Sequence, residues 1–261
     1  MTDRIRKLLV EKGKEELEAP WRTYPFTKVK DADKLLNNLR HYPHAFVIAC
    51  ICDRQMKAEK AWLVPYSLQQ RIGTFEFSDL SMHSVEDVVH HMTNPSSLHR
   101  YAPTVGKSIH SALRLIAGKY DGDARKIWSR KPSSADVVYR FLEFPGVGVK
   151  IATMAANILA RIFKVKFREY YSIDISPDVH VRRVFTRLGL IREKAPNEEL
   201  IYRARALSPE FPGLLDSPAF EIGRNWCRPK KRMCGECFMR EECPSASAAE
   251  RHATFAPVLS S

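Results

Sequence analysis

"FLEFPGVGVKIATMAANIL", residues 141–159, joins two apolar helical segments through a Pro-Gly-Val-Gly turn. Gly146 and Gly148 permit backbone conformations that other residues avoid, and they keep side chains out of the turn. Backbone N–H groups at the start of the second helix are then open to an anion such as a phosphate. Turns of this kind also occur without any ligand, so this stretch alone predicts a helical hairpin and no more.

Lys150 lies in the first turn of the second helix of this hairpin. A cation is electrostatically disfavoured there, because a helix N-terminus carries partial positive charge. Lys150 is therefore either a solvent-exposed lysine without a function or a nucleophile whose neutral amine form is favoured by this position. For the second alternative we also expect partial burial.

The overall composition is consistent with a protein that binds a polyanion. The 261 residues include 42 Lys and Arg against 30 Asp and Glu, a net charge of +12, which favours nucleic acid first among partners. No apolar run approaches the roughly 18 residues of a membrane span, and the charged N-terminus does not resemble a signal peptide. We therefore expect no membrane association and a location in the cytoplasm (nucleoid-associated) of a bacterium or archaeon, or in a eukaryotic nucleus.

Apolar residues recur at spacings of three and four through most of the chain, which predicts an all-α fold. The strongest strand signal, at 165–176, also fits a loop. Ser84 and Asp87 have the spacing of a capping box. The expected helices span 31–42, 44–55, 56–73, 84–92, 103–120, 133–144, 148–163, 176–191, 197–207 and 217–227.

Asp178 follows Pro177 at the start of one predicted helix, which is an ordinary place for an acid. Taken alone, Asp178 predicts a helix start, and His180 in the same helix predicts a structural role.

Four of the six cysteines fall within 17 residues, with gaps of six, two and five residues between them. In a reducing compartment such a cluster more often binds metal than forms disulfides. Four thiolates suit either a tetrahedral zinc ion or an iron–sulfur cluster, although zinc sites favour two close pairs and this chain has one. The four are Cys227, Cys234, Cys237 and Cys243, and the other two, Cys50 and Cys52, fall in an apolar run that we expect to be buried.

These features occur in one order, as "FPGVGVK" at 144–150, "PDVHV" at 177–181 and "GRNWC" at 223–227 with the cysteines that follow. The combination resembles the endonuclease III family of helix-hairpin-helix DNA glycosylases over roughly residues 40–244. The resemblance implies two helical domains that flank a DNA-binding cleft. A six-helix domain would span 42–163, an iron–sulfur domain would join 1–41 with 164–244, and 245–261 would form a flexible tail.

The resemblance also implies a base excision repair enzyme, a DNA glycosylase with AP lyase activity that acts as a monomer on duplex DNA with a damaged or mismatched base. Lys150 would form a Schiff base with the sugar and Asp178 would assist, removing an oxidised pyrimidine. The four cysteines would hold a 4Fe-4S cluster. DNA contacts would come from Gln55, Gly146, Val147 and Gly148, and from the basic loop: Arg228, Lys230, Lys231 and Arg232.

Two departures leave the substrate base open. The connection between Lys150 and Asp178 has 27 residues, about ten more than the family pattern leads us to expect, and Asp53 and Arg54 precede Gln55 in an unusual segment. An adenine glycosylase is disfavoured, because the resemblance would require a glutamate where Ala49 stands and would not include Lys150. A monofunctional thymine or uracil mismatch glycosylase stays open, as does a non-catalytic DNA-binding protein of the same fold.

Overall fold

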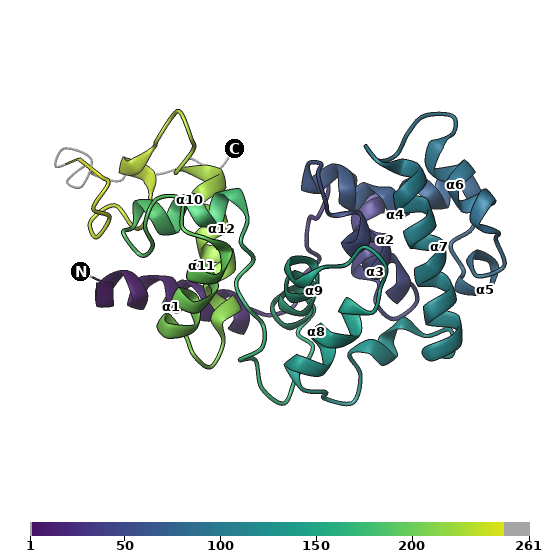
Figure 1. Cartoon of the computed structure of the whole chain (residues 1–261), viewed down its shortest axis with the longest axis horizontal. Helices are drawn as coiled ribbons and strands as arrows, with labels where there is room; N and C mark the ends of the chain where they lie inside the picture. The colour runs from purple at the N-terminus through teal and green to yellow at the C-terminus, as the bar shows by residue number, and fades with distance from the viewer. Residues whose placement is uncertain (1, 248–261) are drawn as a thin grey trace. The chain divides into compact units, whose positions relative to one another are not determined.

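The computed structural model describes residues 2–247 (Figure 1). Regular structure among these residues is helical, apart from an isolated antiparallel bridge between Cys227 and Arg232. The prediction of an all-α fold is therefore confirmed. Of the predicted tail, residues 248–261 lie outside the described range.

The described chain forms two compact units. One joins the chain up to Ala19 with the chain from Glu169 onward, and the other is Pro20–Arg168, which we call the hairpin unit. The hairpin unit contains α2 (Lys30–Asn37), α3 (Pro43–Cys52), α4 (Ala58–Ile72), α5 (Phe77–Leu80), α6 (Val85–Thr93), α7 (Ala102–Lys119), η1 (Ala124–Ile127), α8 (Ser134–Leu142) and α9 (Val149–Arg161).

Helix α3 is the centre of the hairpin unit. All ten of its residues are buried, because its sequence is apolar on every side and α2, α4, α7 and α9 pack around it. The helix ends at Cys52, three residues earlier than the sequence predicted, which leaves Gln55 in the connection to α4. Cys50 and Cys52 are buried as expected.

Local signals fix several helix ends in the hairpin unit. The capping box predicted at α6 is present, since the Ser84 side chain accepts from the Asp87 N–H at 3.1 Å and the Asp87 carboxylate accepts from the Ser84 N–H at 3.0 Å. Helix α4 contains Pro65 and stops at Gly73, whose φ of +85° is the left-handed conformation of a helix C-cap.

The second unit, which we call the cysteine unit, combines the N-terminal helix with the C-terminal part of the described chain. It contains α1 (Thr2–Glu18), α10 (Val179–Arg187), α11 (Asn197–Leu207), η2 (Pro212–Leu215), α12 (Asp216–Asn225) and η3 (Cys234–Glu236). Figure 1 shows α1, from the start of the chain, within the group formed by α10, α11 and α12. Ile5 and Leu9 of α1 are buried in one apolar core with Val184 and Phe185 of α10 and Ile222 of α12.

The segment 165–176 is a loop rather than a strand. Within the cysteine unit, the Gly213 N–H donates to the Ile173 carbonyl at 2.7 Å. The Asp174 carboxylate accepts from Arg205 Nε and Nη2 at 2.7 and 2.8 Å. These contacts fix the segment against η2 and α11 without a partner strand.

The unit boundaries differ from the predicted domain boundaries. Residues 20–41 belong to the hairpin unit, because Phe26 stacks on Trp62 with ring centroids 4.4 Å apart and α2 packs against α3 and α4. At the other boundary the Arg168 N–H donates to the Pro132 carbonyl at 3.0 Å, which keeps residues 164–168 in the same unit. The sequence assigned both segments to the other domain.

Candidate functional site

The hairpin turn connects α8 to α9 as the sequence predicted. Gly146 has a φ of +84°, a left-handed conformation that is strained for residues with a Cβ. Gly148 is the N-cap of α9 and has extended backbone angles. The Val147 N–H donates to the Phe144 carbonyl at 3.0 Å and the Val147 side chain is buried, so Val147 shapes the turn.

Lys150 is the second residue of α9 and is exposed, so the expectation of partial burial is wrong. The helix begins at the turn, and its first residues point their side chains away from the core formed by Ile151 and Ala152. Among the described residues, the Lys150 amine has no hydrogen-bond or ion-pair partner. A free primary amine therefore lies beside the open N–H groups of the α9 N-terminus.

Asp178 is the N-cap of α10 in the cysteine unit. Its Oδ1 accepts the backbone N–H groups of His180 and Val181, each at 2.7 Å, which fixes the carboxylate at the helix start. Its other oxygen has no partner among the described residues, and Asp178 is half-exposed. The N-cap position expected from the sequence is confirmed, and one carboxylate oxygen stays available for other contacts.

His180 packs against α12, in keeping with a structural role. A Cβ at Gly223 would lie 2.8 Å from the His180 Cβ, so α10 and α12 approach closely only because residue 223 is glycine. The His180 ring also meets the Phe220 ring edge-on, with centroids 5.3 Å apart.

Gln55 lies in the connection between α3 and α4. It is exposed, and its φ of +54° is a left-handed conformation that is uncommon for a residue with a side chain. The connection thus presents Gln55 outward from the hairpin unit in a fixed backbone conformation.

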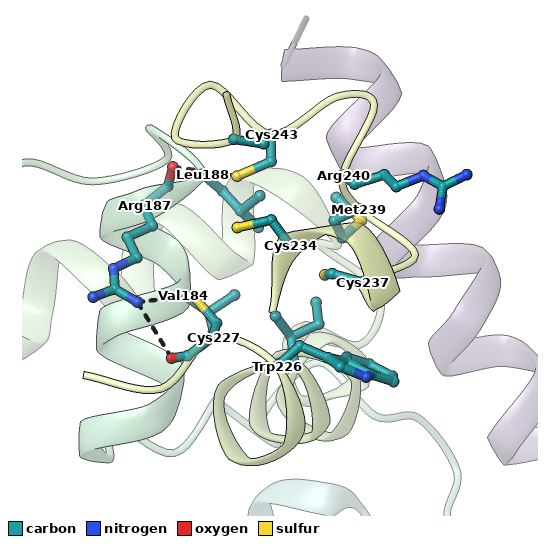
Figure 2. A pocket seen from close by; sticks show the side chains of 12 residues that line it. Val184, Arg187, Leu188, Trp226, Cys227, Cys234, Cys237, Met239, Arg240 and Cys243 are labelled. Atoms are coloured by element: carbon teal, nitrogen blue, oxygen red, sulfur yellow. Dashed lines mark hydrogen bonds between the residues drawn. The ribbon is translucent and has the colours of Figure 1, made fainter. Parts of the chain in front are cut away.

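The four clustered cysteines line one pocket in the cysteine unit. Figure 2 shows their sulfur atoms around the same space, which apolar side chains from α10, α12 and the following loop also line. Burial raises the pKa of the Cys237 thiol to about 12, so its thiolate needs a nearby cation. The lining residues are Val184, Arg187, Leu188, Ile222, Trp226, Cys227, Cys234, Cys237, Met239, Arg240, Cys243 and Ala246.

This donor set fits an iron–sulfur cluster chemically. Four thiols around one largely apolar pocket match the ligands and surroundings of a protein-bound cluster. Arg187 adds a positive charge and donates from Nη1 to the Cys227 Sγ at 3.2 Å (Figure 2), where it would compensate the negative charge of a bound cluster. Among residues 2–247, no group of three or more His, Cys, Asp or Glu side chains is arranged to hold a single metal ion.

Two arginines that the sequence analysis missed hold the loop after Cys227. Arg183 Nε donates to the Cys227 carbonyl at 2.6 Å, and its Nη2 donates to the Gly223 carbonyl at 2.7 Å. Arg187 donates to the carbonyls of Arg228 and Pro229 at 2.9 and 3.2 Å. The only sequence signal was their spacing of four residues, which puts both on one face of α10.

The basic loop presents its charges to solvent. Arg228, Lys230, Lys231 and Arg232 are all exposed. Arg232 donates to the Ser245 carbonyl at 2.9 Å, whereas the two lysine side chains have no partner in the described part of the chain. The loop backbone is thus fixed by α10 while Lys230 and Lys231 stay available to an anionic partner.

No helix within residues 2–247 combines the length and the apolar character that crossing a membrane requires.

Comparison with known proteins gives sequence relatives and a shared fold. No protein-family model matches the chain. Endonuclease III of Thermotoga maritima is 30% identical over 130 residues, 50% of this chain and 52% of that protein. Endonuclease III of Synechocystis is 28% identical over 151 residues, 55% of this chain and 57% of that protein. The chain thus spans about half the length of the curated relatives it matches.

Solved structures match almost the whole chain. A trapped endonuclease III–DNA covalent intermediate has a TM-score of 0.60 at 16% identity, covering 94% of this chain and 97% of that one. A non-covalent endonuclease III–DNA complex has a TM-score of 0.61 at 18% identity, covering 94% and 96%. The chain is therefore similar in sequence to endonuclease III over about half its length and shares its fold. A thermostable thymine-DNA glycosylase shares that fold with a TM-score of 0.61 at 15% identity, covering 94% and 97%.

The 27-residue connection between Lys150 and Asp178 can be followed through both units. It completes α9, crosses from one unit to the other, and then follows η2 and α11 as the loop fixed by Ile173 and Asp174. The part of the connection around Ile173 and Asp174 is therefore held in place by hydrogen bonds.

Proposed function

We propose that this protein is a DNA N-glycosylase with associated AP lyase activity that acts in base excision repair. The observation that carries the proposal is Lys150, an exposed amine without a partner among the described residues, placed at the α9 N-terminus directly after the hairpin turn. The sequence relatives named endonuclease III support it, as do the structural neighbours described as endonuclease III–DNA complexes.

In the proposed reaction the neutral Lys150 Nζ attacks C1′ of the target nucleotide. The C1′–N bond breaks, and the base leaves with the bonding electron pair and takes up a proton. The amine then loses a proton, the sugar ring opens as O4′ is protonated, and a Schiff base forms between Nζ and C1′. Loss of a C2′ proton expels the 3′-phosphate, which nicks the strand, and water finally releases Lys150.

Asp178 is proposed to act with Lys150 through its uncapped carboxylate oxygen. A carboxylate there accepts the proton that the attacking amine must lose, or stabilises the positive charge that develops on the sugar. Because the two N–H bonds to Oδ1 hold the group at the helix start, the reactive oxygen would have a fixed direction.

The proposed partner is double-stranded DNA, bound by a monomer. Backbone N–H groups at Gly146 and Gly148 would hold a phosphate, and the exposed Lys230 and Lys231 would bind others. Gln55 would fill the space that a flipped nucleotide leaves in the duplex. Val147 would contribute through the turn geometry.

The proposed cofactor is a 4Fe-4S cluster held by Cys227, Cys234, Cys237 and Cys243. When bound, it supplies the covalent cross-links that fix the loop 227–243. Arg183 and Arg187 fix the same loop from α10 through its carbonyl groups, so the basic side chains would be presented to DNA from a rigid backbone.

The proposed substrate base is an oxidised pyrimidine, and a panel of lesion-bearing duplexes tests it. Borohydride added during turnover should trap a covalent protein–DNA adduct, and Lys150→Gln should abolish both the adduct and strand nicking while DNA binding is kept. Lys30→Gln is a matched control, because Lys30 is also an exposed lysine in the first turn of a helix of the hairpin unit. Asp178→Asn should slow base release at least a hundredfold, the scale of a lost general base.

The same panel separates the alternatives. Base release at full rate by Lys150→Gln would identify water as the nucleophile and the protein as a monofunctional glycosylase, with thymine and uracil mismatches as the substrates to examine. Unchanged behaviour of both the Lys150 and the Asp178 variants on every lesion would leave a DNA-binding protein without catalysis.

A further inference from the structure

A buried histidine, His99, fixes the backbone of the connection that carries Gln55. His99 Nδ1 accepts the backbone N–H of Tyr101 at 3.0 Å, so the proton of the neutral ring is on Nε2. Nε2 then donates to the carbonyls of Cys52 and Arg54, at 3.2 and 3.1 Å. Burial lowers the pKa of His99, which favours this neutral form. The backbone on the α3 side of Gln55 is thus anchored to the segment before α7.

A second anchor holds the side chain of Asp53. Trp62 Nε1 in α4 donates to its carboxylate at 3.1 Å, and Trp62 is itself stacked on Phe26. With Asp53 and the Arg54 carbonyl both held, Gln55 keeps a left-handed backbone conformation that is unfavourable for an L-residue. Such a conformation persists where surrounding contacts determine it.

Arg54 extends from the same connection to the hairpin turn, 92 residues further along the chain. Its Nη1 donates to the Gly146 carbonyl at 3.2 Å and its Nη2 to Ser108 Oγ of α7 at 3.4 Å. A Cβ built on Gly146 would lie 2.4 Å from Arg54 Nη1, so the guanidinium occupies the space beside the turn that a side chain would fill. Arg54 is half-buried there.

We propose that Arg54 is a positioning residue that couples Gln55 to the hairpin, so that the two elements meet DNA as one rigid body. The inference rests on the proposed function, in which the hairpin holds the backbone and Gln55 enters the duplex. Both contacts form together only if the distance between the two elements is fixed, and Arg54 is the side chain that spans it. The coupling raises the affinity for duplex DNA with a missing or extruded base, since intact duplex has no space for Gln55.

The test measures discrimination between two duplexes of one sequence at one salt concentration, one intact and one with a tetrahydrofuran abasic analogue. We expect Gln55→Ala and Arg54→Gln each to reduce the affinity ratio about tenfold, the scale of one hydrogen bond to a charged group. The double variant should lose no more than either single variant, because both changes remove the same coupled contact. Arg54→Lys should not restore the ratio, since a single ammonium group cannot span both acceptors.

Two outcomes would overturn the inference. Equal loss of affinity for both duplexes, restored by Arg54→Lys, would make Arg54 an ordinary phosphate contact. Additive losses in the double variant would make the two residues independent. Each variant should keep the wild-type visible absorption and unfold in one cooperative transition, with the melting temperature of Arg54→Gln lowered by only about 2–4 °C, which excludes a global folding defect.

A measurement without DNA separates this inference from the proposed function. Arg54→Gln should speed amide hydrogen exchange at least threefold in residues 144–150, where Ser108→Ala, which removes one of the two acceptors, should have a smaller effect. If Arg54→Gln exchanged faster but the wild type showed no preference for the abasic duplex, the Arg54 contact with the hairpin would be supported and the proposed function would be contradicted. Unchanged exchange in Arg54→Gln would contradict the inference that Arg54 couples Gln55 to the hairpin.

Discussion

Replacing Gly146 with alanine should destabilise the hairpin unit by about 2 kcal/mol. The φ of +84° costs an L-residue about 1–2 kcal/mol. The added Cβ also displaces the Arg54 guanidinium, which forfeits a hydrogen bond of about 1 kcal/mol. Against these losses, alanine restricts the unfolded chain and returns about 0.5 kcal/mol.

Gly148→Ala is the matched control two residues away. Gly148 has a φ of −97°, and a Cβ there would meet no atom within 4 Å. Alanine is a poorer N-cap than glycine, which costs about 0.5–1 kcal/mol, and the restricted unfolded chain returns most of this. We therefore expect this variant to be as stable as the wild type.

The assay is urea unfolding at 25 °C, followed by the fluorescence of tryptophans, two of which, Trp62 and Trp128, are buried in the hairpin unit. The 2 kcal/mol difference corresponds to a melting temperature lower by about 4–8 °C, the scale for units of 150–250 residues. If the two alanine variants agreed within about 0.5 kcal/mol, which is near the limit of the method, the reasoning about the left-handed turn and the Arg54 contact would be refuted.

Three further results are expected. Purified protein should be brown with about four irons per chain, and Cys234→Ser should lower the iron content; a colourless protein with stoichiometric zinc would contradict the cluster. Reversing charge at Lys230 and Lys231 should weaken binding to damaged and intact duplex alike and flatten the salt dependence; an effect on damaged DNA alone would make them lesion readers. His44 is buried, with its Nε2 2.9 Å from the Phe75 carbonyl oxygen, and burial lowers the pKa of His44 to about 4. Because the unfolded His44 binds a proton more readily, stability should fall by up to about 3 kcal/mol as pH drops from about 6.5 to 4, and His44→Gln should flatten that loss.

Local sequence patterns were enough to predict most of the helices and the hairpin turn. Apolar spacing predicted the long helices from α2 onward but not α1 (Thr2–Glu18), and short-range signals such as the Ser84 capping box and Gly73 marked helix ends where the structure has them. The Pro-Gly-Val-Gly turn, the Asp178 N-cap and the burial of α3 were predicted for the same reason. Each depends on residues within a few positions of one another, and such interactions are written directly in local sequence.

Which distant groups meet depends on how the helices pack against one another. The packing of α3, α7 and α9 brings Arg54 to Gly146 and Ser108, and the packing of α10 on α12 brings Arg183 and Arg187 to the loop after Cys227. The sequence does not indicate which carbonyl groups an arginine will contact, because every residue has the same backbone carbonyl. The exposure of Lys150 and the placement of residues 20–41 were missed for a related reason. Both depend on which faces the assembled helices cover, and a single segment does not contain that information.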